Sequence, residues 1–134
     1  MRASISSRVT SFRFRFSPPV LTLLVILGMI LHGFISFYPH LEFVSVLHLL
    51  QDYQIYIRYF FYFTLFLHVI EAGACIYQLT NFKNKISQNQ LVDLSNYEMI
   101  SVLYVIQTLI VGFPTFEALH KEMDRVLDET SHQD

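Results

Sequence analysis

Long apolar runs without charged residues dominate the pattern along the chain. No Asp, Glu, Lys or Arg occurs in three stretches, which lie between Arg15 and Glu42, between Arg58 and Glu71, and between Glu98 and Glu117. About twenty mainly apolar residues in a helix match the hydrocarbon thickness of a bilayer. The pattern therefore predicts an all-α fold, a three-span transmembrane helical bundle with spans at about 20–38, 56–79 and 99–119.

The segments around these runs are more polar. Residues 41–52 are too short to span a bilayer and set polar positions opposite an apolar stripe, which predicts a short interfacial helix; a re-entrant loop is the alternative. Residues 80–97 predict a polar loop, and Pro114 predicts a kink in the third span because proline cannot donate to the carbonyl one turn back. We therefore expect a basic tail over 1–17, the bundle over 18–120 and a charged tail over 121–134.

Composition agrees with a membrane protein and excludes other classes. The chain of 134 residues is 53% hydrophobic and 15% charged, whereas soluble domains carry about 25% charged residues. With a net charge of −2 and no basic patch, it lacks the footprint of a nucleic-acid-binding protein. Cys75 is the only cysteine, so no intrachain disulfide can form, and zinc-type ligand spacing is absent. Glu117 and His120 have the Glu-x-x-His spacing of di-iron bundles, but they lie at the opposite membrane surface from Glu71, so we expect no metal and no other cofactor. The expected partners are the lipid bilayer and either other membrane proteins or a lipid-like ligand.

Basic residues predict the orientation, since cytoplasmic segments carry an excess of Lys and Arg. With three spans, the side that holds the N-terminus and the 80–97 loop collects six basic residues: Arg2, Arg8, Arg13, Arg15, Lys83 and Lys85. The other side collects three: Arg58, Lys121 and Arg125. This predicts a cytoplasmic N-terminus in the endoplasmic reticulum or another secretory-pathway membrane. The alternative is a mitochondrial membrane, because a stretch rich in Arg and Ser and free of acids also resembles a mitochondrial targeting segment.

Four strongly polar side chains interrupt the apolar runs: His32, His68, Glu71 and Gln107. Counted from the span ends at about 1.5 Å per residue, they fall in one layer roughly 12 to 18 Å deep. Polar residues at such depth are costly and usually face other helices or a water-filled cavity. His68 and Glu71 are three residues apart on one helix and can contact each other. We therefore predict an intramembrane polar cluster, either as structural hydrogen bonding between helices or as a proton or ligand site.

These features favour a small non-enzymatic accessory or scaffold component that acts through helix–helix contacts. The alternative is an intramembrane lipid- or sterol-binding protein or isomerase, with His68 and Glu71 as proton-transfer groups and His32 or Gln107 orienting the substrate. Sterol isomerases of the emopamil-binding type place His and Glu inside a helical bundle in a comparable way. A third reading, a transporter or channel subunit, requires oligomers because three spans are few for a pore.

The stretch from Tyr59 to Leu119 resembles the transmembrane protein 254 family, small multi-pass membrane proteins of unknown function. The resemblance rests on three short motifs, which are His68, Val69 and Glu71; Lys83, Lys85, Ile86 and Ser87; and Gln107, Thr108 and Gly112. The chain differs from that family in a longer loop after Ile86 and in the lack of tryptophan. The resemblance implies a class of membrane protein and no reaction.

Overall fold

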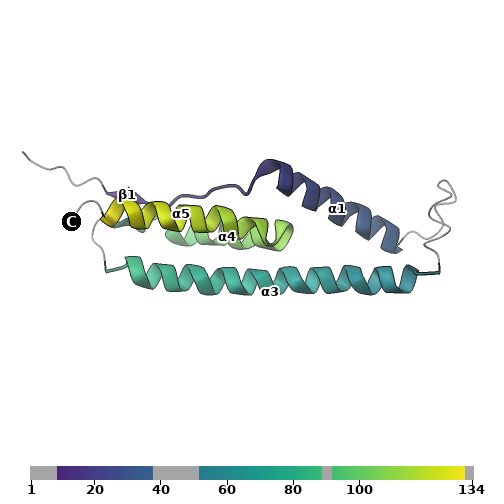
Figure 1. Ribbon diagram of the computed structural model, residues 1–134. Coiled ribbons are helices and arrows are strands. Elements are labelled where there is room, and N and C mark those ends of the chain that lie inside the picture. The colour runs from purple at the N-terminus through teal and green to yellow at the C-terminus, as the bar shows by residue number, and fades with distance from the viewer. Residues whose placement is uncertain (1–8, 38–51, 89–91, 132–134) are drawn as a thin grey trace, which may run out of the picture.

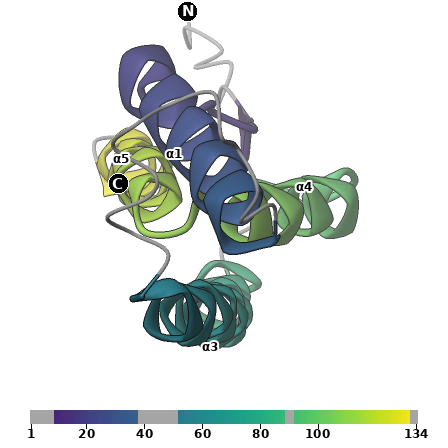
Figure 2. The same cartoon turned by 90° about the vertical axis from the view of Figure 1, so that its right-hand side faces the viewer.

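One long helix, α3 (Gln54–Ile86), runs the length of the molecule, and the other helices pack along it (Figure 1). α1 (Pro19–Phe37) lies beside the N-terminal half of α3. α4 (Tyr97–Val111) and α5 (Pro114–Ser131) lie beside its C-terminal half. Figure 2, a view along the molecule, shows α4 and α5 on two sides above α3, with α1 crossing in front of them.

The computed structural model describes residues 9–37, 52–88 and 92–131. These residues are mostly helical, which confirms the predicted all-α class. Two strands of two residues each, β1 (Thr10–Ser11) and β2 (Val92–Asp93), pair in parallel. The predicted interfacial helix at 41–52 lies outside the described residues, apart from Asp52, which is in a turn.

α1 is an uncharged apolar helix whose last turn is bound by α3. It begins at Pro19, which suits the first helical position because the N–H there has no partner within the helix. Arg58 of α3 donates to the carbonyl of Ser36 at 3.4 Å, and its guanidinium lies 5.6 Å from the centre of the Phe37 ring. A cation is favourable at a helix C-terminus, where carbonyl dipoles converge. This contact joins the end of α1 to the start of α3, so the two helices run antiparallel.

The third apolar run does not form one continuous helix. α4 ends at Val111 and is followed by Gly112, whose φ of +73° lies in the left-handed region, and α5 begins at Pro114. A glycine with positive φ is a common way to end a helix, and proline is suited to start the next one. α4 starts at the end of the molecule where α3 ends and runs away from it, and α5 turns back beside α4 toward that same end (Figure 1). We call residues 112–114 the elbow.

This reversal corrects the prediction of three spans. Within the described residues, two helices are long and apolar enough to cross a membrane, and these are α1 and α3. The predicted span at 99–119 is divided between α4 and α5, and α4 alone has 15 residues. The predicted loop at 80–97 is also shorter than expected, because α3 continues to Ile86 and β2 occupies Val92–Asp93.

The buried apolar side chains of α3 lie in its C-terminal half, and most of those in its N-terminal half are exposed. A buried core lies where its C-terminal half meets α4, α5 and the segment before α1; its members include Phe12, Cys75, Leu79, Phe82, Tyr104, Leu119 and Val126. By contrast, α1 and the N-terminal half of α3 expose most of their large apolar side chains. The molecule therefore combines a core-forming end, built from three helices and the N-terminal segment, with an apolar two-helix end.

Candidate functional site

The predicted polar cluster is partly assembled, around the elbow. His68 Nδ1 lies 3.0 Å from the carbonyl oxygen of Leu109. Because a carbonyl only accepts, Nδ1 is the donor. Leu109 belongs to the last turn of α4, whose carbonyls have no donor inside the helix. His68 therefore caps the C-terminal end of α4 from the neighbouring helix.

Glu71 approaches the same elbow from one turn further along α3. A Cβ atom added to Gly112 would lie 2.7 Å from Glu71 Oε2 and 3.1 Å from His68 Nε2. The two polar atoms thus converge on the position that the missing side chain leaves open. Glu71 Oε2 is buried and has no hydrogen-bond partner among the described residues. A carboxylate beside the start of α5 is favourable because the positive end of that helix dipole lies there.

The other two members of the predicted cluster lie elsewhere. His32 Nε2 is 3.1 Å from the carbonyl oxygen of Ile57, and its ring packs against Phe60 and Phe61 with ring centres 5.4 and 5.3 Å apart. Since Ile57 precedes His68 by eleven residues, this contact is about 16 Å from the elbow along α3. Gln107 is half-buried on α4, and its Nε2 has no partner among the described residues. His32 therefore joins α1 to α3, while His68 and Glu71 hold the elbow.

No described group of three or more His, Cys, Asp or Glu side chains is arranged to hold a metal ion. The spacing of Glu117 and His120 suits a metal ligand pair, but each binds a different neighbour. Glu117 pairs with Lys121 at 2.6 Å, and His120 Nε2 lies 3.0 Å from Gln78 Oε1 of α3. His120 is thus a further contact between α5 and α3.

A groove of about 510 Å³ runs between α3 and α4, away from the elbow. Its lining is mainly apolar and includes Ile76, Leu79, Val102, Val105 and Ile106, with an ion pair between Lys83 and Glu98 at one end. None of the four predicted cluster residues lines it. The elbow residues therefore do not face this groove.

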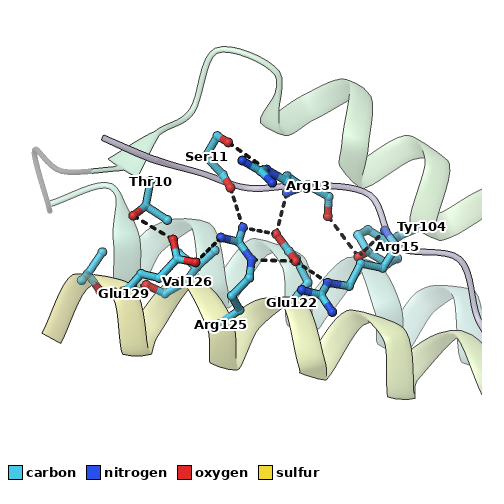
Figure 3. A network of polar contacts seen from close by, with 10 residues as sticks. Thr10, Ser11, Arg13, Arg15, Tyr104, Glu122, Arg125, Val126 and Glu129 are labelled. Carbon is cyan, nitrogen blue, oxygen red and sulfur yellow. Dashed lines mark hydrogen bonds and ion pairs between the residues drawn. The ribbon is translucent and has the colours of Figure 1, made fainter. Parts of the chain in front are cut away.

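A second polar network, which the sequence did not predict, lies at the core-forming end (Figure 3). The side chain of Glu122 on α5 is fully buried. It accepts hydrogen bonds from the backbone N–H of Arg13 and from Arg15 Nε, both at 2.7 Å, and from the guanidinium of Arg125. Arg125 also donates to the carbonyl of Ser11 at 2.7 Å. We call these four residues, Arg13, Arg15, Glu122 and Arg125, the Glu122 network.

The Glu122 network holds the N-terminal segment against α5 and α4. The hydroxyl of Tyr104 extends it, because it accepts from the Arg15 N–H at 3.0 Å and donates to the Arg13 carbonyl at 3.2 Å. Burial alone raises the pKa of the Glu122 carboxyl, but the hydrogen bonds from Arg125, Arg15 and Arg13 outweigh it and hold the pKa below the ordinary 4.5. Glu122 is therefore ionised at neutral pH and fully paired.

A sequence signal for Glu122 does exist. Leu119, Met123 and Val126 recur at helical spacing, and Glu122 lies on that same buried face of α5. A charged residue on the apolar side of a helix needs a partner. The arginines before α1 supply it, over 100 residues away in the sequence.

Searches with family models, among curated proteins and among solved structures found no match to this chain. The resemblance to the transmembrane protein 254 family therefore stays a prediction.

Proposed function

We propose that this chain is a small, non-enzymatic accessory or scaffold component of a membrane, which it crosses twice through α1 and α3. The observation that carries this proposal is the use of His68 in a helix–helix contact. Its Nδ1 caps α4 at Leu109, and Glu71 lies against the same elbow. A polar side chain that makes the contact of His68 holds two helices together and does not need a substrate to explain it.

The contacts of the N-terminal segment support an even number of crossings. Thr10 pairs with Val92, and the Arg13 N–H binds Glu122. The segment before α1, the segment between α3 and α4, and α5 therefore lie at one end of the molecule. A chain that leaves this end through α1 and returns through α3 crosses the bilayer twice, with these three parts on the same face.

The distribution of basic residues favours this topology more strongly than it favours three spans. Of the nine Lys and Arg residues in the chain, only Arg58 lies beyond α1 on the far side. The remaining eight lie before α1, at the end of α3 or on α5. Eight against one gives a stronger bias than six against three, because Lys121 and Arg125 change sides. By the excess of basic residues in cytoplasmic segments, we place this face in the cytoplasm of a secretory-pathway membrane.

Purification of the tagged chain in a mild detergent, with bound proteins and lipids identified together, tests the accessory role. We expect a protein in stoichiometric amount and no stoichiometric small lipid. The matched variant is Glu71→Gln, which we expect to leave the bound material unchanged. A stoichiometric sterol or lipid that the wild type retains and Glu71→Gln loses, with both chains folded, contradicts the proposal and favours the isomerase.

A further inference from the structure

The length of α1 fixes where the hydrocarbon begins along α3 on the two-span topology proposed above. α1 has 19 residues without a charge, a length of about 28 Å, and the hydrocarbon core is about 30 Å thick. Arg58 of α3 binds the carbonyl of Ser36 near the far end of α1, and the two helices run antiparallel. Pro19 therefore lies at the level of about residue 75 of α3, and this level is the cytoplasmic edge of the hydrocarbon.

The elbow lies inside this edge. His68 Nδ1 is 3.0 Å from the carbonyl oxygen of Leu109, and Glu71 lies against Gly112. His68 and Glu71 come about seven and four residues before the edge, which is about 10 and 6 Å along α3. α4 also contacts α1, as a helix that reaches the level of the span must do. Figure 1 shows the same overlap, since the turn between α4 and α5 reaches past the start of α1 along the molecule.

The charged residues on both sides of the elbow lie at or beyond the same edge. On α4, Glu98 pairs with Lys83, about 12 Å outside the hydrocarbon. On α5, His120 contacts Gln78, so Glu117, one turn earlier, lies at about the level of the edge. No charged residue occurs between Glu98 and Glu117. The charges therefore end at the depth where a bilayer excludes them.

The backbone of the elbow is hydrogen-bonded within the protein, which hydrocarbon requires of any break in a helix. The Gly112 N–H donates to the carbonyl of Thr108 at 2.7 Å, and the first two N–H groups of α5 donate to carbonyls of the elbow at 3.0 and 2.9 Å. Pro114 has no N–H to satisfy. His68 supplies a donor to the carbonyl of Leu109, which water would supply to a turn in solvent.

We propose that the elbow is a re-entrant turn: α4 enters the hydrocarbon of the cytoplasmic leaflet, and α5 leaves it on the same side. The partner of the elbow is then the acyl chains of that leaflet. They cover the large exposed side chains nearest to it, Leu109, Ile110 and Phe113, which are 45%, 53% and 72% exposed. This inference rests on the proposed two-span topology, to which it adds a part of the chain that enters the membrane without crossing it.

Depth measurements on the purified full chain in liposomes test the re-entrant elbow. In a Cys75→Ala chain, Phe113→Cys places a fluorescent label at the elbow and Met99→Cys places one at the start of α4. Ile70→Cys places a label on α3 within the span, at about the depth of the elbow. The three side chains replaced by the labelled cysteine are exposed, so no core contact is lost.

The quencher is a nitroxide on the acyl chain of the lipid, which reaches only labels at hydrocarbon depth. We expect quenching at Phe113→Cys to be within about twofold of that at Ile70→Cys and at least about fivefold stronger than at Met99→Cys. In intact microsomes, we expect a membrane-impermeant maleimide to label Met99→Cys at least about tenfold faster than Phe113→Cys. A thiol in hydrocarbon neither ionises nor meets the reagent.

Quenching at Phe113→Cys as weak as at Met99→Cys, with Ile70→Cys strongly quenched, overturns the re-entrant elbow and leaves the two spans in place. Weak quenching at Ile70→Cys as well overturns the two-span topology itself. If Phe113→Cys is protected from maleimide in microsomes but is not quenched in liposomes, another protein covers the elbow in the native membrane, and the proposal is wrong.

Discussion

At Gly112 the backbone conformation selects the smallest residue. Its φ of +73° is strained for any residue with a side chain, and a Cβ there would also require the end of the Glu71 side chain, with Oε2 at 2.7 Å, to move. Glu122 shows the opposite situation, a large charged group in a fully buried position. It is tolerated because all its hydrogen-bonding capacity is used by arginine donors and a backbone N–H. Gly112 allows the turn between α4 and α5, and Glu122 binds the N-terminal segment to α5.

Replacing Gly112 by Ala tests the first of these points. We expect Gly112→Ala to destabilise the protein by about 2–3 kcal/mol, from the positive φ and the displacement of Glu71 together. Gly73→Ala on α3 is the matched control, because no atom lies within 4 Å of its added Cβ. Thermal unfolding in detergent, followed by fluorescence-detected chromatography, measures both variants. Equal melting temperatures for the two would show that the elbow does not need glycine.

Acid is expected to loosen the N-terminal segment through Glu122. Its pKa is lower in the folded protein than the ordinary 4.5, so the network stabilises the fold above that pH, and the stabilisation is lost as the pH falls below it. Hydrogen exchange of the Phe12 to Arg15 amides measures this release. Glu122→Gln is the control, since it lacks the titrating group.

At neutral pH we expect Glu122→Gln to lose about 2 kcal/mol of stability. This is less than a fully buried pair loses, because Arg15 is 45% exposed and water screens its charge. In this variant the same amides should exchange faster at pH 7 and show a smaller change on acidification. An acid response of equal size in both proteins would assign it to other groups.

Among the helices, the sequence predicts α1 and the start of α3 well, misses the last seven residues of α3, and predicts the region after Glu98 poorly. Hydropathy and the absence of charge define α1 almost to the residue, as 19–37 against the expected 20–38. The run at 99–119 has the same composition, but a helix reversal depends on the backbone conformation of Gly112, which no apolar pattern encodes. Proline in an apolar run also predicts a kink more readily than a turn back.

Two opposite sides of α4 provide a test at this scale. Ile100 is 7% exposed and faces the core, whereas Ile106, on the other side of α4, is 47% exposed. We expect Ile100→Asp to destabilise the detergent-solubilised monomer by about 3–5 kcal/mol or prevent folding, because it buries an unpaired charge. Ile106→Asp is expected to change the stability of the monomer by less than about 1 kcal/mol. Similar losses from both changes would mean that α4 is buried on all sides.

In the candidate site, too, the sequence predicts contacts between residues close together in the chain but not contacts between distant residues. The contact of His68 and Glu71 with one elbow agrees with their spacing of three residues on α3. Their shared neighbour, Gly112, depends on how α4 and α5 dock, so the sequence pattern alone does not supply it. The Glu122 network joins residues more than 100 positions apart. The sequence does not predict it, because Arg13 and Arg15 are equally typical of an exposed basic tail.

At the scale of the whole molecule, the central claim is that α1 and α3 cross the bilayer and every other described element returns to one face. The N-terminal segment contacts both β2 and α5 directly, so these three parts cannot lie on opposite sides of a membrane. On the topology that we propose, the core-forming end is a small bundle on the cytoplasmic side of a two-helix membrane anchor.

Labelling of introduced cysteines in sealed microsomes tests this claim most directly. In the Cys75→Ala chain, Asp128→Cys places a thiol on exposed α5 and Asp52→Cys places one before α3. We expect a membrane-impermeant maleimide to label Asp128→Cys in intact vesicles and to label Asp52→Cys only after permeabilisation. Protection of both positions in intact vesicles is the result of a three-span chain and would rule out the two-span topology.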